Sequence, residues 1–315
     1  MNATPIRTQY LEVKRRYSDC LLLFRLGDFY EAFDDDARIL ARELDIVLTS
    51  RQMGRNTRVP LAGIPYHSLE RHLATLIGKG HRVALCEQLT TAPVKGSGGG
   101  GRGLIERDVV RVVTPGTVLE PGLLRGKVNN YLAAYVSDGR RAGIAHADVS
   151  TGDFSATEVE ESAALAELHR IGPSELIVPR GFNRAEAGLP GFITRRPDSA
   201  FEHMQAKREL QQHFGTRTLA AYGLARWPLA TTAAAAIVAY LRETQPCSAE
   251  QLTRLTSYHT ANYMVLDEHT VRSLEIFESS GGAPSLLSTL DETRTAMGGR
   301  LLRRWLRQPL LDGVE

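Results

Sequence analysis

Phe29 and Glu31 stand two positions apart, directly after the Gly-Asp pair that follows an apolar run over residues 20–26. The run predicts a buried strand, and the pair predicts a turn. A Phe on a loop beside a basic surface can insert as a wedge between stacked bases, and a neighbouring polar group can then hydrogen-bond the displaced base. The alternative is that Phe29 and Phe33, four residues apart, anchor the start of a helix to the core.

The sequence patterns on either side of this segment predict a small mixed α/β unit over residues 1–115, which would position it. Helical spacing predicts three helices, over 10–17, 34–44 and 66–80. The second has three acids in its first turn, where they suit the helix dipole. Short apolar runs predict four strands: 20–26, 46–49, 59–64 and 82–86. The unit carries 17 Lys and Arg against 13 Asp and Glu, which permits a phosphate-binding face without requiring one.

A second unit is predicted over residues 116–245. Three short strands separated by Asp-Gly and Thr-Gly pairs predict an antiparallel meander: 130–136, 143–149 and 153–158. A helix over 160–171 and a strand over 176–178 follow. Strands followed by alternating helix and strand favour a mixed sheet flanked by helices.

From about residue 248 the pattern becomes more helical and ends in a predicted helix over 293–310. Four arginines lie on this helix, and we interpret them as a solvated face or a contact with sequence further along: Arg300, Arg303, Arg304 and Arg307. The chain stops at Glu315 without a C-terminal cap, so we expect it to be truncated. The fold class predicted for the whole chain is α/β multidomain.

Composition excludes several classes of protein. The chain has 315 residues, of which 43% are hydrophobic and 23% charged, as in ordinary globular proteins of two or three domains. Its longest apolar stretch, about 229–241, is alanine-rich and too short to span a bilayer. No secretory signal opens the chain, and three distant cysteines argue against a disulfide framework or a cysteine-based metal site. We therefore expect a cytoplasmic protein with no membrane partner.

Two features invite a catalytic interpretation. Asp148 and Asp153 lie across a predicted hairpin and could coordinate Mg²⁺ in a two-metal nuclease of the ribonuclease H type, but no further acids can be placed beside them. A turn-forming Asp pair is the favoured interpretation. The glycine-rich segment 95–103 lacks the Lys-Ser/Thr of a P-loop, so it predicts a flexible segment and no nucleotide cradle.

An ordered set of motifs resembles the N-terminal part of the MutS family of DNA mismatch-repair proteins and covers essentially the whole chain. The matching stretches occur in the family's order: 10–11 (YL), 24–33 (FRLGDFYEAF), 44–51 (LDIVLTSR), 62–67 (AGIPYH), 83–88 (VALCEQ), 107–117 (RDVVRVVTPGT), 147–152 (ADVSTG), 215–217 (GTR), 274–276 (LEI) and 300–306 (RLLRRWL).

The resemblance implies a role for each part of the chain. Residues 1–115 would form the mismatch-recognition domain, 116–245 a ribonuclease H-like connector domain without nuclease function, and 246–315 the truncated start of a helical lever/core domain. Phe29 would stack against the mispaired base and Glu31 would hydrogen-bond its ring edge. Arg51 and Arg107 match positions near the DNA and would contact its backbone.

The resemblance also implies partners. The chain would bind duplex DNA with mismatches or small loops, whereas the full-length family protein would be a homodimeric ATPase clamp that uses ATP and Mg²⁺ and recruits a MutL-type partner. This chain would carry no ATPase domain and no cofactor, and its location would be cytoplasmic and nucleoid-associated. Two alternatives remain: a ribonuclease H-like metal nuclease, and a paralogue that binds branched DNA, against which the intact Phe29-Tyr30-Glu31 argues.

Overall fold

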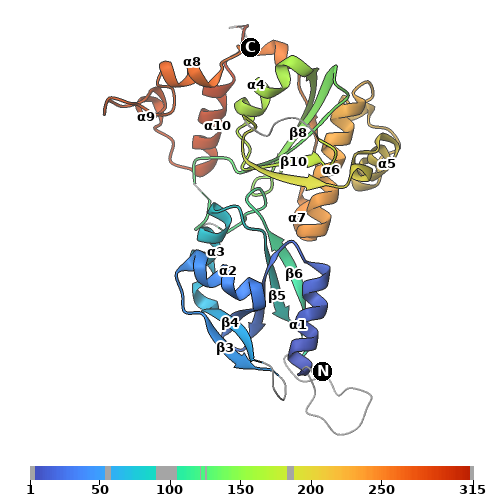
Figure 1. Ribbon diagram of the computed structural model, residues 1–315. Helices are drawn as coiled ribbons and strands as arrows, with labels where there is room; N and C mark the ends of the chain where they lie inside the picture. The colour runs from blue at the N-terminus through green and yellow to red at the C-terminus, as the bar shows by residue number, and fades with distance from the viewer. Residues whose placement is uncertain are drawn as a thin grey trace. The chain divides into compact units, whose positions relative to one another are not determined.

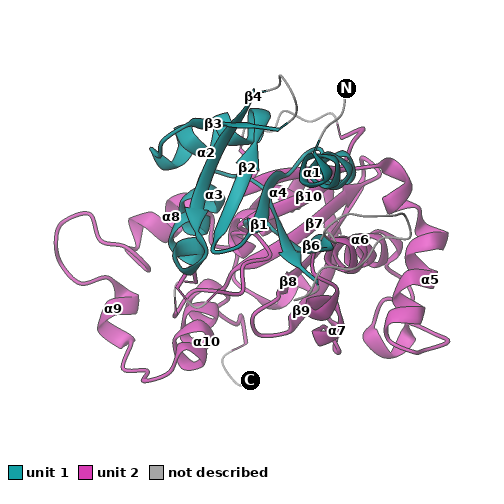
Figure 2. Cartoon of the chain, turned by 90° about the horizontal axis from the view of Figure 1, so that it is seen from below, with its two compact units in different colours: residues 1–115 teal, residues 116–315 magenta. Residues whose placement is uncertain are grey.

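The chain divides into two compact units, Met1–Pro115 and Gly116–Glu315 (Figure 1 and Figure 2). The computed structural model describes residues 4–53, 58–89, 105–120, 122–124, 126–182 and 188–312. The glycine-rich segment 95–103 lies outside these residues, so its predicted flexibility stays a prediction. The separation of 116–245 from 246–315 as two domains likewise stays a prediction.

A six-stranded sheet with the strand order β3-β4-β2-β1-β5-β6 forms the centre of the first unit. Neighbouring strands run antiparallel, except that β1 and β5 are parallel. The strands are β1 Leu21–Leu26, β2 Phe29–Phe33, β3 Thr49–Gln52, β4 Arg58–Pro65, β5 Val83–Gln88 and β6 Arg107–Val113.

Helices cover both faces of this sheet: α1 (Pro5–Arg16) on one face, and α2 (Asp34–Leu44) and α3 (Leu69–Gly78) on the other (Figure 2). On the α1 face the ring of Tyr10 meets Phe24 and Phe33 edge to face, with centroids 5.6 and 4.8 Å away. Such pairs add to the burial of apolar surface. These contacts fix α1 over the middle of the sheet.

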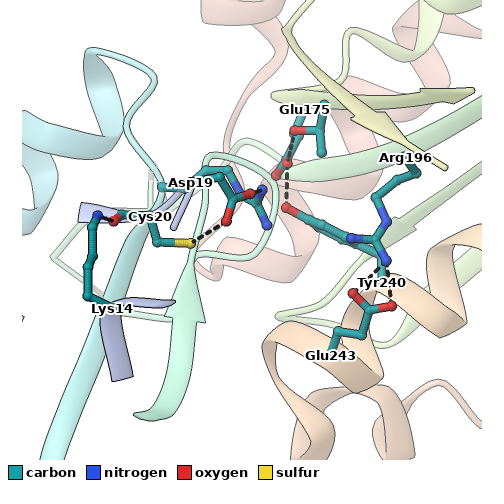
Figure 3. Close-up of polar contacts among 9 residues, drawn as sticks. Lys14, Asp19, Cys20, Glu175, Arg196, Tyr240 and Glu243 are labelled. Carbon is teal, nitrogen blue, oxygen red and sulfur yellow. Dashed lines mark hydrogen bonds and ion pairs between the residues drawn. The ribbon is translucent and has the colours of Figure 1, made fainter. Parts of the chain in front are cut away.

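A buried carboxylate joins α1 to α2 and to the start of β1. Asp36 accepts hydrogen bonds from the Tyr10 hydroxyl (3.0 Å), the Lys14 ammonium (2.9 Å) and the backbone N–H of Leu22 (3.2 Å). Lys14 also donates to the carbonyl of Cys20 over 2.6 Å (Figure 3). The first-turn acid therefore serves the packing of the unit as well as the helix dipole.

Two sequence-based expectations for this unit are wrong in detail. The strand expected over 46–49 lies at Thr49–Gln52, because α2 ends at Asp45 in a left-handed conformation (φ 53°) and the following residues form the connection. Val47 is 82% exposed there. Residues 29–33 form a strand and not the start of a helix, so only Phe33, which is buried, acts as the expected core anchor.

The second unit contains another six-stranded sheet, in the order β11-β10-β7-β8-β9-β12. The meander of β7, β8 and β9 is antiparallel, as predicted, while β10 runs parallel to β7 and β11 parallel to β10. This is the ribonuclease H-like arrangement that was expected. The strands are β7 Tyr131–Ser137, β8 Arg141–Asp148, β9 Asp153–Glu160, β10 Glu175–Pro179, β11 Phe192–Arg196 and β12 Thr256–Ser257.

The alanine-rich helix α6 (Pro228–Thr244) packs on one face of this sheet and α4 (Glu161–Ile171) on the other (Figure 1). The approach of α6 is very close at Gly143 of β8. A Cβ there would stand 2.1 Å from the carbonyl carbon of Leu229, so only glycine fits. Helix α5 (His203–His213) packs against α6 in turn.

A buried carboxylate on β10 organises the start of this unit. Glu175 accepts hydrogen bonds from the hydroxyls of Thr194 (2.6 Å) and Tyr240 (2.7 Å) and from the backbone N–H of Gly116 (3.0 Å). Figure 3 shows Tyr240 reaching Glu175 from one side while Arg196 lies over its ring and pairs with Glu243. Residue 116 is thereby attached to the sheet.

The last part of the chain is helical, as expected, but in short pieces: α7 Pro246–Gln251, α8 Glu268–Ser273, α9 Leu286–Leu290 and α10 Ala296–Arg307. Helix α10 carries the four arginines, yet their interpretation as a solvated face is wrong for three of them, since Arg303 lies over the ring of Phe277 and two others form hydrogen bonds. Arg300 donates to the Ser150 hydroxyl (3.2 Å) and Arg307 to the carbonyl of Arg170 (2.9 Å). These contacts dock α10 on the β-sheet part of the unit.

Four single 3₁₀ turns complete the described elements: Tyr66–Ser68, Asp198–Phe201, Ala220–Tyr222 and Thr260–Asn262. The helix expected over 66–80 is therefore a 3₁₀ turn followed by α3, which ends at Gly78. Among the helices of the described residues, none combines the length and the apolar character that crossing a bilayer requires.

Candidate nucleic-acid interface

The Phe29 ring lies exposed at the start of β2, directly after the tight turn that joins β1 to β2. Gly27 provides the turn with a φ of 60°, a conformation that favours glycine. Along β2 the side chains alternate between the sheet faces. Phe29 is 46% exposed, whereas Tyr30 is 3% exposed and hydrogen-bonds Glu87. Phe33 lies on the same face as Phe29 yet is buried against Tyr10, so the exposure of Phe29 comes from its place at the start of the strand.

A paired backbone holds Phe29 in place. It lies opposite Leu26 on β1 and opposite Pro65 on β4, and the backbone N–H of Tyr66 donates to the carbonyl of Asp28 over 2.9 Å. The ring is thus presented by a central strand and not by a mobile loop. An exposed aromatic ring on a rigid element forgoes burial energy of about 2 kcal/mol, which marks it as a candidate contact residue.

Glu31 lies on the same sheet face as Phe29 because the two residues are two positions apart on one strand. Its cross-strand neighbour on β4 is Gly63, where a Cβ would stand 3.2 Å from the carbonyl oxygen of Tyr30 and 3.4 Å from Cγ of Glu31. The small residue therefore leaves room for the Glu31 side chain to lie across β4.

Arg51 from β3 reaches the Glu31 carboxylate, with its Nη1 atom 3.3 Å from Oε2. The Glu31 side chain is 17% exposed and the Arg51 side chain 50% exposed. Burial raises the pKa of Glu31, and the positive charge of Arg51 partly opposes that rise. The ion pair is long and open to water, so it contributes little and Arg51 can exchange Glu31 for another anion.

Arg107 does not occupy the position expected of a phosphate contact. The residue is 7% exposed, and its guanidinium donates to the carbonyls of Arg25 (2.7 Å) and Ile105 (3.0 Å) and to the side chain of Gln9 (3.2 Å). It also lies over the ring of Phe24, 5.4 Å from the centroid. Geometry of this kind supports an internal role that ties β6 to β1, and it does not support a contact with the DNA backbone.

Sequence reasoning missed one exposed aromatic residue beside Phe29. Tyr66 is 50% exposed, and the guanidinium of Arg25 lies over its ring at 4.1 Å from the centroid. Tyr66 stood in a motif of the sequence but was assigned only to a helix start. Its place next to the β1–β2 turn follows from the pairing of β2 with β4, which no local pattern reveals.

Comparison with known proteins identifies the family. Three family models match in order: MutS domain I over residues 4–121, MutS domain II over 130–253 and MutS domain III over 269–315. The DNA mismatch repair protein MutS of Dehalococcoides mccartyi (strain CBDB1) is 49% identical over 314 residues, 98% of this chain and 36% of that protein. The chain belongs to the MutS family.

Other MutS proteins are similar over the same span. The DNA mismatch repair protein MutS of Symbiobacterium thermophilum is 45% identical over 325 residues, and that of Solibacter usitatus is 41% identical over 325 residues. The matches cover 98% and 99% of this chain but 36% and 37% of those proteins. The chain thus spans little more than a third of the length of these MutS relatives.

In the part that matches MutS domain II, the two candidate nuclease acids do not form a metal site. The Asp148 carboxylate accepts hydrogen bonds from the side chain of Asn129 (2.8 Å) and from the backbone N–H (3.0 Å) and hydroxyl (2.6 Å) of Ser150. Asp153 is exposed on the neighbouring strand. Within the described ranges no group of three His, Cys, Asp or Glu side chains could hold a metal ion. The geometry favours the turn interpretation of the pair.

Proposed function

We propose that this MutS family member recognises mispaired or looped duplex DNA through the face of β2 that carries Phe29 and Glu31. The observation that supports this most directly is the exposed Phe29 ring on a rigid, paired strand. The carboxyl of Glu31 lies on the same face, two residues away. The MutS relatives named above are called DNA mismatch repair proteins, which agrees with this assignment.

Phe29 would act as a wedge. Insertion of an apolar side chain at a base step costs a few kcal/mol of unstacking, and this cost is lowest where pairing is already broken. Stacking of a base on an aromatic ring returns about 1–3 kcal/mol. The balance therefore favours a mispaired site over intact duplex, and deformability of the DNA determines specificity more than base sequence does.

Glu31 would test the base that the wedge displaces. As a carboxylate it is repelled by the phosphates of intact DNA, whereas a protonated carboxyl can donate a hydrogen bond to a base edge. Burial raises its pKa and so favours the protonated form. Arg51, whose bond to Glu31 is long, would turn to a phosphate of the backbone when the carboxyl engages a base.

The activities of the whole protein are proposed on family membership, since this chain spans 36% of its first relative. The chain itself would be a DNA-binding module and not an enzyme. The full-length protein would form homodimers, bind ATP and Mg²⁺ in an ATPase domain and recruit a MutL-type partner. We propose a cytoplasmic, nucleoid-associated location, where its duplex substrate lies.

A binding assay at low salt tests the proposal, since phosphate contacts weaken as salt rises. The wild-type chain, Phe29→Ala and the control Phe192→Ala are compared on a G·T or single-base-loop duplex and on its matched duplex. Phe192 is 43% exposed on β11, so its truncation removes a comparable ring elsewhere. We expect mismatch preference in the wild type and the control, and its loss in Phe29→Ala.

Three results would contradict the proposal. If Phe29→Ala weakened binding to the mismatched and the matched duplex equally, Phe29 would not be a wedge that is specific for mismatches. Tighter binding to a four-way junction than to the mismatched duplex would favour the branched-DNA paralogue. Cleavage of labelled DNA or RNA–DNA hybrid with Mg²⁺ or Mn²⁺ would favour the nuclease alternative.

A further inference from the structure

A small cavity of about 100 Å³ lies within the second unit, between α10 and the β7–β8 part of the sheet. It is lined by residues far from Phe29 in sequence. Nothing in the proposed recognition of DNA uses it. Its walls are rich in side chains that donate hydrogen bonds and carry positive charge, and the residues that matter here are Tyr131, His146, Arg170, Arg304, Arg307 and Gln308.

The arginines of the cavity wall, to which Arg303 also belongs, differ in how far described residues compensate their charge. Arg170 is compensated, since its Nε donates to the carboxylate of Glu167 over 2.7 Å. Arg307 donates to a backbone carbonyl, that of Arg170, and the nearby carboxylate of Glu268 is engaged by Arg272. Arg304 has neither an ion pair nor a hydrogen bond within the part of the chain that the structure describes.

His146 contributes a polar atom without a partner. Its Nδ1 is buried and makes no hydrogen bond to any described residue, while the ring lies edge to face with Tyr131 and Tyr258. Burial, followed by the charges of Arg170 and Arg304, lowers the pKa of His146 to about 3. The imidazole is therefore neutral at physiological pH, so His146 adds no positive charge to the cavity wall.

The wall formed by α10 is fixed in place at both ends. Near its start, Lys127 pairs with Asp291 (2.8 Å) and packs so closely on Gly299 that a Cβ there would stand 2.5 Å from Cγ of Lys127. After its end, the backbone N–H of Met264 donates to the carbonyl of Pro309 over 2.8 Å. The backbone that carries Arg304 and Arg307 is thus fixed before any ligand arrives, which lowers the entropy that binding must overcome.

We propose that this cavity is a binding site for a phosphate-type oxyanion, which Arg304 and Arg307 would contact. Guanidinium groups match the oxygens of phosphate in geometry and form charge-assisted hydrogen bonds. A tetrahedral oxyanion would give the Arg304 guanidinium the negative partner that it lacks among the described residues. The volume admits such a group.

The source of the oxyanion is either free phosphate or the phosphate of a nucleotide. A second depression of about 520 Å³ shares Tyr131, His146, Arg304 and Gln308 with the cavity and continues along β9, with Asp153 among its walls. It offers aromatic surface to a nucleoside while the cavity holds the phosphate. Both sources present the same group to Arg304.

Calorimetric titration of the chain tests this site at constant ionic strength, because screening by added salt would otherwise mimic competition. The probes are inorganic phosphate, adenosine monophosphate and adenosine. The variants are Arg304→Gln and the matched control Arg300→Gln, which removes the same charge from the same helix but from a residue bonded to Ser150 outside the cavity. Circular dichroism verifies that both variants fold.

We expect saturable one-site binding of phosphate, weakened about tenfold or more by Arg304→Gln and less than about twofold by Arg300→Gln. Tighter binding of the monophosphate than of phosphate, with none of adenosine, would assign a nucleotide, and equal binding of the two would assign free phosphate. The absence of saturation up to about 20 mM phosphate, or equal loss in both variants, would overturn the site.

Discussion

The Glu175 carboxylate accepts a hydrogen bond of 3.0 Å from the backbone N–H of Gly116, fifty-nine residues earlier in the chain. Next to this bond, the amide of Gln245 donates to the carbonyl of Thr117 over 2.6 Å. Residues 116 and 117 are both buried. The first residues of the second unit are consequently part of its interior and not a loose tether.

Replacing this carboxylate should destabilise the second unit. Glu175→Gln would set an amide NH₂ against the donor N–H of Gly116, so we expect a loss of about 2–4 kcal/mol in the free energy of unfolding. Tyr240→Phe removes one of the hydroxyl donors and should cost only about 1 kcal/mol. Urea unfolding followed by circular dichroism measures both. Equal effects of the two variants would show that the carboxylate charge is not decisive.

Removal of the Glu31 charge should strengthen binding to perfectly paired DNA. The carboxylate repels phosphates, so Glu31→Ala and Glu31→Gln should raise the affinity for matched duplex by roughly threefold to tenfold. The preference for mismatched over matched duplex should fall because the affinity for matched duplex rises. Glu70→Gln, an exposed acid on α3, provides the control for net charge. Equilibrium binding to matched duplex is the measurement, and an unchanged affinity in both Glu31 variants would refute the repulsion.

The pH dependence of mismatch binding should carry the signature of Glu31. Burial raises its folded-state pKa above the ordinary value of about 4.3. The protonated form then persists above that value, and any interaction that needs the proton is lost as pH rises through the folded-state pKa. We expect affinity for mismatched duplex to fall as pH rises across this window, and Glu31→Gln to abolish that part of the dependence. Parallel pH profiles for wild type and variant would exclude Glu31 as the titrating group.

A salt titration of DNA binding should distinguish the phosphate contact proposed for Arg51 from the internal role of Arg107. Arg51→Gln removes an exposed cation, so the slope of log affinity against log salt should fall by about 1 while stability is unchanged. Arg107→Met breaks hydrogen bonds to two backbone carbonyls and should lower the stability of the first unit by about 2 kcal/mol with no change in slope. A smaller slope of log affinity against log salt in Arg107→Met would show that Arg107 contacts a phosphate after all.

Local patterns were sufficient for much of the fold. The acidic first turn located α2 at its observed bounds, and the Asp-Gly and Thr-Gly pairs located the meander of β7 to β9. Each of these features depends on residues that are neighbours in sequence.

The features that escaped prediction depend on contacts across long sequence separations. Arg107 is drawn inward by carbonyls on β1, 82 residues earlier, and nothing in its own motif distinguishes it from an exposed arginine. The run at 46–48 is apolar yet lies outside the sheet, because the strand that pairs with β4 is the polar one after it. The arginines of α10 looked solvated because their partners, Ser150 and Arg170, lie more than a hundred residues away.

The close approach of α6 to Gly143 has a genetic consequence. Any side chain at residue 143 would collide with the backbone of Leu229, so substitutions at this position should unfold the second unit. A screen for repair-deficient alleles would recover such changes alongside losses of Phe29. Protein abundance in the cell distinguishes the two classes, because misfolded chains are degraded whereas a chain without its wedge accumulates normally.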